Sequence, residues 1–179
     1  MSAGLVLAAG EGKRFGGPKQ LARLDGRPLI EHALGALAEL ERVVVVLGAR
    51  ADEIRAGGDL GSAEIVVCAG WAEGMGASLR AGLAALGDAD EVVIVLADQP
   101  FITREVVARV RAAPGDGARA VYGGAPGHPV VVRRRLLERA GEPRGDQGFR
   151  GVAMTEVECG DLADPQDIDT RADLEVVRR

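Results

Sequence analysis

Two groups of residues in this sequence are suited to chemistry on phosphates. One is the segment LVLAAGEGKRFGGPKQL at positions 5–21, where glycines and cations follow an apolar run. Glycines allow backbone N–H groups to converge on an anion, and Lys13, Arg14 and Lys19 would add positive charge. The other is Asp98, which follows the apolar run VVIVLA. Because Mg²⁺ prefers carboxylate and phosphate oxygens, the two groups together predict a site for a metal-bound polyphosphate.

The glycine loop is predicted to leave the carboxyl end of a strand, where open α/β sheets bind their ligands. Pro18 suits the first position of a helix, whose N-terminus would add a positive dipole behind the loop. Two familiar phosphate-binding motifs are excluded. A P-loop has Lys where this chain has Pro18, and the dinucleotide fingerprint has Gly where this chain has Phe15.

Apolar runs without alternation mark the strands that must position these residues. They lie at 4–9, 42–48 and 91–97, with a weaker run at 63–69. Strands that are buried on both faces of a parallel sheet have this pattern. Apolar residues at helical spacing predict helices over 29–40, over 76–87 and after Thr103, the expected N-cap of the third helix. The alternation of strands and helices predicts an α/β fold with a parallel sheet.

The second half of the chain is less regular. Residues 118–124 and 128–134 predict two strands that face each other across GGAPG in an antiparallel pair. A further strand is expected at 152–159, and a closing helix at 169–179 with Thr170 or Asp169 as its cap. No linker or internal repeat interrupts the pattern, so residues 1–179 are expected to form a single domain.

Composition limits the class of protein. The chain is 47% hydrophobic and 27% charged, as globular domains usually are. A net charge of -5 argues against a nucleic-acid partner, and no apolar run approaches the roughly 18 residues of a membrane span. Cys68 and Cys159 are too few for a disulfide framework, and no signal-peptide pattern opens the sequence. We therefore expect a cytoplasmic protein with no nucleic-acid or membrane partner.

Six segments carry a resemblance to a known family. They are LAAGEGKRFGGPKQL (7–21), WAEGMGASLRAGL (71–83), LADQPF (96–101), GHPVVV (127–132), GDQGFR (145–150) and DIDT (167–170). The first is similar to the signature loop of the MobA-like nucleotidyltransferases, and the chain most resembles their molybdenum cofactor cytidylyltransferase branch. The resemblance implies a Rossmann-like, three-layer α/β/α sandwich with a mostly parallel sheet, of the nucleotide-diphospho-sugar transferase type.

The resemblance also implies roles for the matching residues around the nucleotide. The nucleotide would be lined by Leu7, Ala8, Ala9, Gly10 and Gly12, and its base or ribose would meet Gly74 and Ser78. Arg14 and Lys19 would hold the triphosphate and offset charge on the leaving pyrophosphate, which makes both of them catalytic. Asp98 would be the third catalytic residue, as a ligand of Mg²⁺ beside the α-phosphate.

The remaining roles concern the metal and the acceptor. The resemblance implies that Asp169 is the second metal ligand, although an acidic stretch before a helix otherwise indicates a cap and a solvated face. His128, and Asp146 in the GDQG turn, would face the acceptor. Phe149 stands where the family carries alanine in this turn, a departure on the acceptor side.

The implied activity is the transfer of CMP from CTP to a terminal phosphate of the molybdenum-pterin cofactor, with release of pyrophosphate and Mg²⁺ as cofactor. A transient handover of the product to a molybdoenzyme or its chaperone would follow. Ala9 favours CTP, because guanylyl-transferring relatives carry LAGG where this chain has LAAG, and the extra methyl would crowd a purine.

Three alternatives stay open at this point. Two are enzymes: a guanylyltransferase for the same cofactor, or a cytidylyl- or other nucleotidyltransferase for a sugar or polyol phosphate. The third is a nucleotide-binding regulatory module without catalysis. The presence of both Lys19 and Asp98 argues against that module, since a protein without catalysis would tolerate the loss of either residue.

Overall fold

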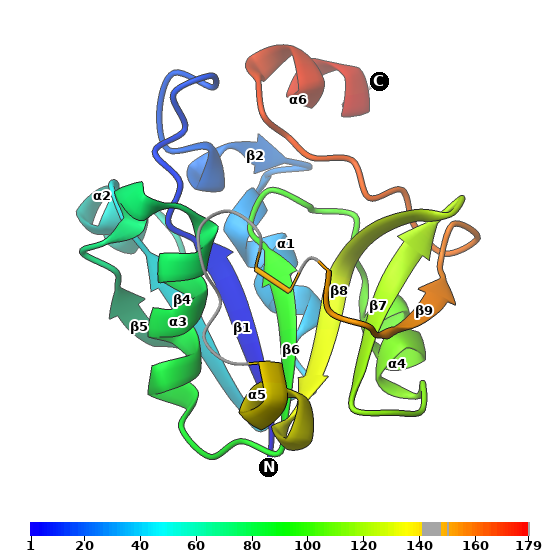
Figure 1. The fold of residues 1–179 in the computed structure, drawn as a ribbon. Helices are drawn as coiled ribbons and strands as arrows, with labels where there is room; N and C mark the ends of the chain where they lie inside the picture. Colours follow the sequence, from blue (N-terminus) through cyan, green and yellow to red (C-terminus); the bar gives the residue numbers. More distant parts are fainter. Residues whose placement is uncertain (141–147, 150, 179) are drawn as a thin grey trace.

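One mixed sheet of seven strands forms the centre of the molecule, in the order β5-β4-β1-β6-β8-β7-β9 (Figure 1). This computed structural model describes residues 1–140, 148–149 and 151–178. The strands are β1 (Ser2–Ala8), β4 (Arg42–Leu47), β5 (Glu64–Val67), β6 (Glu91–Leu96), β7 (Gly117–Tyr122), β8 (Ala125–Arg133) and β9 (Thr155–Glu158). β1 pairs in parallel with β4 and β6, and β8 runs antiparallel to β6 and β7. The predicted parallel sheet and the antiparallel pair are therefore both confirmed.

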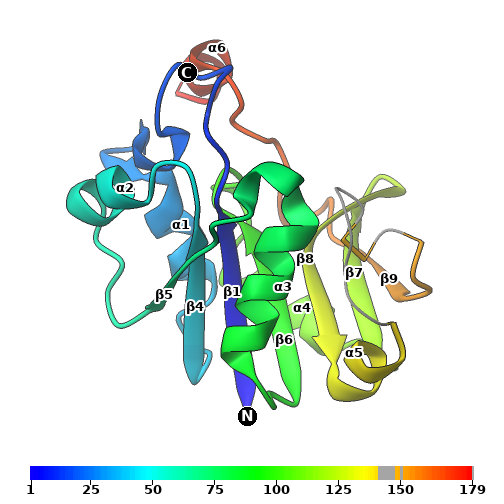
Figure 2. The same ribbon diagram turned by 60° about the vertical axis from the view of Figure 1, so that its left-hand side comes forward.

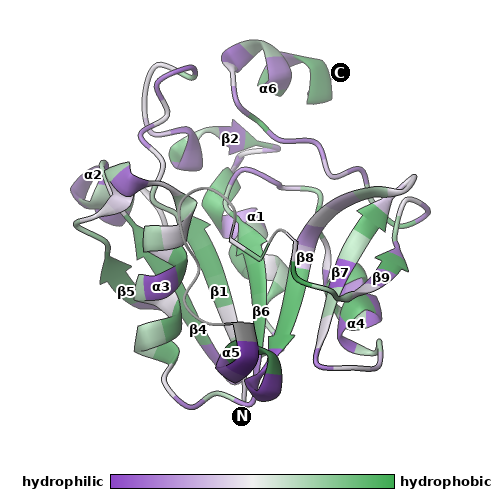
Figure 3. Cartoon of the chain, in the orientation of Figure 1, coloured by the Kyte–Doolittle hydropathy of each residue, from purple (hydrophilic) through white to green (hydrophobic). Residues whose placement is uncertain are grey.

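Helices cover both faces of this sheet and give the chain a Rossmann-like, three-layer α/β/α fold (Figure 2). The helices are α1 (Leu29–Ala36), α2 (Ala51–Gly57), α3 (Met75–Leu86), α4 (Arg104–Arg111), α5 (Arg134–Ala140) and α6 (Arg171–Val177). One buried cluster joins α1, α2 and α4 to one face of the sheet, and a second cluster joins α3 and α5 to the other. In Figure 3 the strands near the middle of the sheet, β1, β4 and β6, are predominantly hydrophobic, as expected for strands that are covered on both faces.

The helix expected after Pro18 does not form. Pro18 instead precedes a single turn of 3₁₀ helix, η1 (Lys19–Leu21), which is too short to present the predicted dipole to the loop. The chain then enters a small hairpin of β2 (Arg23–Leu24) and β3 (Arg27–Pro28). Asp25 and Gly26 form its turn with φ of 51° and 79°, and an Asp-Gly pair of this kind is a strong hairpin signal that takes the chain out of the helix.

Other boundaries differ by a few residues. The first predicted helix ends at Ala36 rather than at residue 40, and the predicted strand at 152–159 begins only at Thr155. Both predicted caps are confirmed: Thr103 caps α4, and Thr170 caps α6 in a capping box with Asp173. Among the residues that the structure describes, no helix has the length and hydropathy needed to cross a bilayer.

Candidate active site

A pocket of about 340 Å³ opens at the carboxyl ends of β1 and β6, beside the start of α3. Its lining includes eight of the predicted site residues, namely Leu7, Ala8, Ala9, Gly10, Lys19, Gly74, Ser78 and Asp98. Gly12, Arg14, Asp169 and His128 lie outside this lining, and Asp146 lies outside the described residues. The structure therefore gathers most of the residues predicted for the nucleotide in one place, with Asp98 at the same strand edge as the glycine loop.

The glycine loop is closed on itself. The N–H groups of Gly16 and Gly17 donate to the carbonyl of Gly12 at 2.9 and 3.3 Å, so these two donors do not face outward as the sequence predicted. Gly12 has φ of +70°, and a Cβ at this position would lie 2.0 Å from the carbonyl oxygen of Gly17. Only glycine fits here, because a side chain would both strain the backbone and separate the two ends of the loop.

Gln20 holds the first part of the loop from behind, a role that the sequence did not suggest. Its amide Nε2 donates to the carbonyls of Ala8 and Gly10 at 2.8 and 3.0 Å. The side chain is 2% exposed, and its Oε1 is buried without a partner among the described residues. The amide thus fixes the backbone at the point where β1 turns into the loop. A single polar residue after Lys19 carries no pattern from which this contact could be predicted.

Lys19 lies at the centre of a charged cluster. Its Nζ donates to Asp98 Oδ2 at 2.5 Å and to Asp169 Oδ1 at 2.8 Å, while Arg14 forms an ion pair of 2.8 Å with Asp169 Oδ2. Burial lowers the pKa of Lys19, but the charge of Asp98 and the hydrogen bonds to both carboxylates outweigh it, so the pKa is raised. Hydrogen bonding to Lys19 in turn lowers the pKa of Asp169. The structure thereby joins the two predicted metal ligands to the two predicted phosphate-binding cations.

Asp169 reaches this cluster because its segment is anchored to β6. The Ile168 N–H donates to the carbonyl of Asp98 at 2.9 Å, and Ile168 itself is fully buried. Asp173 of the α6 capping box accepts a bond from the Asp169 N–H at 3.0 Å. The sequence did not indicate a third anchor, in which Gln99 Nε2 donates to Asp167 at 2.7 Å. These bonds hold the Asp169 carboxylate within reach of Lys19, which also contacts Asp98.

The other wall of the pocket contains the chain's single tryptophan. Trp71 belongs to η2 (Trp71–Glu73) and is partly exposed to the pocket while it packs on the core beneath α3. Gly74 follows with φ of +110° and begins α3, in whose first turn Ser78 is 4% exposed. Trp71 therefore both packs on the core and lines the pocket.

His128 lies on β8, half-buried, and is not among the residues that line this pocket. Burial lowers the pKa of His128 to about 4, against the attraction of Asp98, so the imidazole is neutral at pH 7. Nearby, Phe149 of the GDQGFR segment is 8% exposed within the core, and its carbonyl accepts a bond of 3.3 Å from Arg119. The departure from the family pattern at Phe149 thus places an aromatic ring inside the protein.

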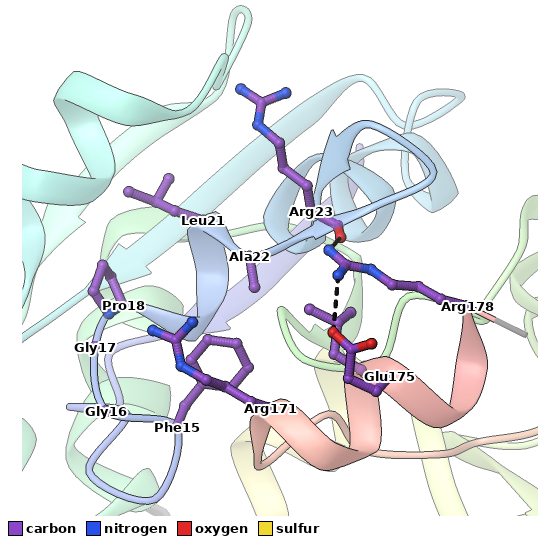
Figure 4. Close-up of a pocket in the computed structure, with 11 residues that line it drawn as sticks. Phe15, Gly16, Gly17, Pro18, Leu21, Ala22, Arg23, Arg171, Glu175 and Arg178 are labelled. Carbon is purple, nitrogen blue, oxygen red and sulfur yellow. Dashed lines mark hydrogen bonds and ion pairs between the residues drawn. The ribbon is translucent and has the colours of Figure 1, made fainter.

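A second pocket of about 470 Å³ lies on the outer side of the glycine loop, between the loop, β2 and α6 (Figure 4). Arg171 of α6 stacks over the ring of Phe15, with 5.2 Å between the guanidinium carbon and the ring centroid. Arg178 bonds to Glu175 and to the carbonyl of Arg23. Phe15 also packs with Leu174 in a small buried cluster. Helix α6 therefore supports the glycine loop from outside and carries Asp169 at its start.

The charged cluster is also the place where a divalent metal would fit. Asp98 and Asp169 offer carboxylate oxygens that already converge on one cationic atom, Lys19 Nζ. In the described part of the chain, however, no group of three or more His, Cys, Asp or Glu side chains is able to hold a metal ion. Two carboxylates without further protein ligands suit Mg²⁺ or Mn²⁺ that is completed by phosphate oxygens and water.

Comparison with known proteins agrees with this geometry. Residues 4–159 match the MobA-like NTP transferase domain. The nicotine blue oxidoreductase of Paenarthrobacter nicotinovorans is 35% identical over 98% of this chain and 93% of its own length. The 2-C-methyl-D-erythritol 4-phosphate cytidylyltransferase of Rubrobacter xylanophilus is 35% identical over 70% of this chain, which spans 55% of that relative.

Solved structures have the same fold. A homologue of Mycobacterium tuberculosis Rv0371c from Mycobacterium sp. strain JC1 superposes with a TM-score of 0.83 at 30% identity, covering 99% of this chain and 94% of its own. Rv0371c of Mycobacterium tuberculosis H37Rv in complex with manganese superposes with a TM-score of 0.75 at 27% identity, covering 98% of this chain and 97% of its own. The match over residues 4–159 and the shared fold show that the chain belongs to the family of MobA-like NTP transferase domains.

Proposed function

We propose that this chain transfers CMP from CTP to a phosphorylated acceptor, the molybdenum-pterin cofactor, and releases pyrophosphate. The observation that carries the proposal is the contact of Lys19 with Asp98 at the edge of the pocket formed by the glycine loop and α3. This arrangement places a charged ammonium and a carboxylate beside the backbone that would line the nucleotide. A family of NTP transferases and a cytidylyltransferase relative support the same reaction class.

The chain's own residues would contribute charge and position. Lys19 and Arg14 would stabilise the negative charge that develops on pyrophosphate as the bond to the α-phosphorus breaks. The attacking phosphate oxygen is ionised at neutral pH, so no general base is required. His128, with a pKa lowered to about 4 by burial, is accordingly not needed as a base. A divalent ion on Asp98 and Asp169 would polarise the α-phosphate when bound.

The choice of CTP rests on Ala9, whose side chain lines the pocket and is 8% exposed. A Cβ added to Gly48, at the end of β4, would lie 2.9 Å from the Ala9 Cβ and 2.4 Å from its carbonyl oxygen. The Ala9 methyl is therefore packed closely between β1 and the loop after β4 and cannot easily move away from a larger base. Because the methyl limits the space beside the base, a pyrimidine is favoured over a larger purine.

The test is nucleotide binding followed by turnover. Calorimetry would measure nucleotide binding to the wild type and to Asp98→Ala. The nucleotides would be CTP, GTP, ATP and UTP, each with and without Mg²⁺. We expect Mg²⁺-dependent CTP binding that weakens in the variant, and pyrophosphate release when CTP and a phosphorylated pterin are both present. Preferred binding of GTP would favour the guanylyltransferase alternative, and the absence of nucleotide binding would refute the proposal.

An oxidoreductase is the second candidate, because the relative that matches 98% of this chain is named as one. Such an enzyme would consume a reduced donor, for which NADH and NADPH are the natural probes. The chain lacks the last glycine of the dinucleotide fingerprint, since Phe15 stands there, which argues against a Rossmann-type dinucleotide site. Loss of NADPH absorbance with a dye acceptor, without any pyrophosphate release from CTP, would favour this candidate over nucleotidyl transfer.

A further inference from the structure

Lys19 has two incompatible tasks in the proposed reaction. It is expected to hold the triphosphate, yet its Nζ lies 2.5 Å from Asp98 and 2.8 Å from Asp169, the two proposed metal ligands. A divalent ion bound to the same two oxygens would lie about 2 Å from each of them. The ion and the ammonium would then overlap and repel each other. Lys19 and the metal therefore cannot occupy this position together.

The charges of the cluster lead to the same conclusion. Asp98 and Asp169 are already paired with Lys19 and Arg14, and the carboxyl of Asp167 lies close enough to interact with Asp98, Asp169 and Lys19. All three side chains at the centre of the cluster are largely shielded, with 15% of Lys19, 18% of Asp98 and 26% of Asp169 exposed. A divalent cation added without a triphosphate would bring two positive charges into a poorly solvated place where Asp98 and Asp169 already have cationic partners, which is unfavourable. A triphosphate would supply the missing negative charge and further oxygen ligands.

We propose that Lys19 is the resident cation of the metal site and leaves Asp98 and Asp169 for the divalent ion only when a triphosphate offers it new oxygen partners. This inference rests on the proposed function, of which it describes the order of events. Metal and nucleotide would then bind cooperatively, and Lys19 would set the size of that coupling. Because coupling between two ligands is reciprocal, the metal would raise nucleotide affinity by the same factor.

The test compares the affinity of the folded wild-type chain for Mn²⁺ with that of its variants, in the absence of nucleotide. The EPR signal of the free ion measures how much Mn²⁺ is bound. Lys19→Met removes the resident cation, and we expect it to tighten Mn²⁺ binding by about tenfold or more. Arg139→Met is the control: it also removes one positive charge, but Arg139 lies on α5 with its side chain 66% exposed, and it pairs with Asp116. This control should leave Mn²⁺ affinity unchanged. Lys19→Gln, which keeps a neutral polar side chain, repeats the test should the Met variant not fold.

A double variant identifies the site of the gained affinity. Asp98→Asn combined with Lys19→Met should abolish the gain, and its survival would place the ion elsewhere and overturn the proposal. Mn²⁺ binding that is equally weak, or equally tight, in the wild type and both Lys19 variants would also overturn it. In the wild type, saturating CTP should then raise Mn²⁺ affinity, and this coupling should shrink when Lys19 is replaced. Failure of CTP to bind would contradict the proposed function alone, since the first comparison contains no nucleotide.

Discussion

The buried amide of Gln20 holds the start of the glycine loop, and Gln20→Leu removes that amide with little change in volume. The carbonyl of Ala8 would lose a donor at 2.8 Å and that of Gly10 a donor at 3.0 Å. A buried acceptor without a partner costs about 1–3 kcal/mol, as expected for Ala8. The carbonyl of Gly10 is in a partly exposed contact, where water can replace the amide at a cost of about 1 kcal/mol.

One contribution has the opposite sign. The Oε1 of Gln20 is buried without a partner among the described residues, and its removal returns about 1 kcal/mol. The net expectation is a fall of about 1–3 kcal/mol in the free energy of unfolding, measured by urea denaturation. A less ordered loop should also bind CTP more weakly, because part of the binding free energy is then needed to order the loop. Each 1.4 kcal/mol needed in this way lowers the affinity about tenfold.

The affinity for CTP can be measured from the intrinsic fluorescence of the protein. Trp71 is the chain's single tryptophan and lines the pocket, so its fluorescence reports nucleotide binding without a label. Gln166→Leu makes the same substitution at a partly exposed position and should change stability by no more than about 0.5 kcal/mol. If Gln20→Leu has the stability and the CTP affinity of the wild type, the amide does not hold the loop and the reasoning is refuted.

Three further predictions concern the base, the metal ligand and the histidine. Ala9→Gly should shift the ratio of kcat/KM for CTP and GTP toward GTP, by up to about 1–3 kcal/mol, and an unchanged ratio would contradict the steric argument. Asp173→Ala removes the acceptor of the Asp169 N–H and one half of a capping box. It should lower stability by about 1 kcal/mol and weaken Mn²⁺ binding in the presence of CTP, and normal Mn²⁺ binding would show that Asp169 is positioned without it. His128 should titrate near pH 4 by NMR, because burial lowers its pKa from 6.5. As the pH falls, the unfolded chain protonates His128 at a higher pH than the folded chain does. This residue should therefore reduce the free energy of unfolding as the pH falls from about 6.5 to about 4. A measured pKa near 6.5 in the folded protein would show that the imidazole is not desolvated.

The sequence was sufficient for the strands that lie near the middle of the sheet. β1, β4 and β6 are unalternating apolar runs, and such runs have few other stable arrangements than a sheet covered on both faces. It was misleading after Pro18, where a proline followed by helix-forming residues outweighed the Asp25–Gly26 turn signal. The hairpin depends on two adjacent residues with positive φ, whereas a helical pattern is spread over many residues, so a hairpin this short is easily hidden in the sequence.

The candidate site was predictable where one motif supplies several neighbouring residues. The glycine loop reaches this pocket from the end of β1. Gly74 and Ser78 reach it from the N-terminal end of α3. Gln20 and Gln99 were not predictable, because each acts through a single hydrogen bond network that depends on the folded backbone. Asp146 stays a prediction, since it lies outside the described residues.

The ion pairs of Lys19 with Asp98 and Asp169 show that the type of a residue does not determine which groups it contacts in the folded protein. The sequence motifs predict that Lys19 contacts phosphate and that Asp98 binds metal, and both predictions concern the protein with its ligands bound. In the ligand-free protein the same charges must neutralise one another, because a partly buried charge without a partner is costly. The anchoring of Ile168 to Asp98 brings Asp169 within reach, and Lys19 then bridges both carboxylates. Under the proposed function, the phosphate-binding cation therefore rests where the metal would act, and the exchange that we propose would restore the balance of charge when a triphosphate binds.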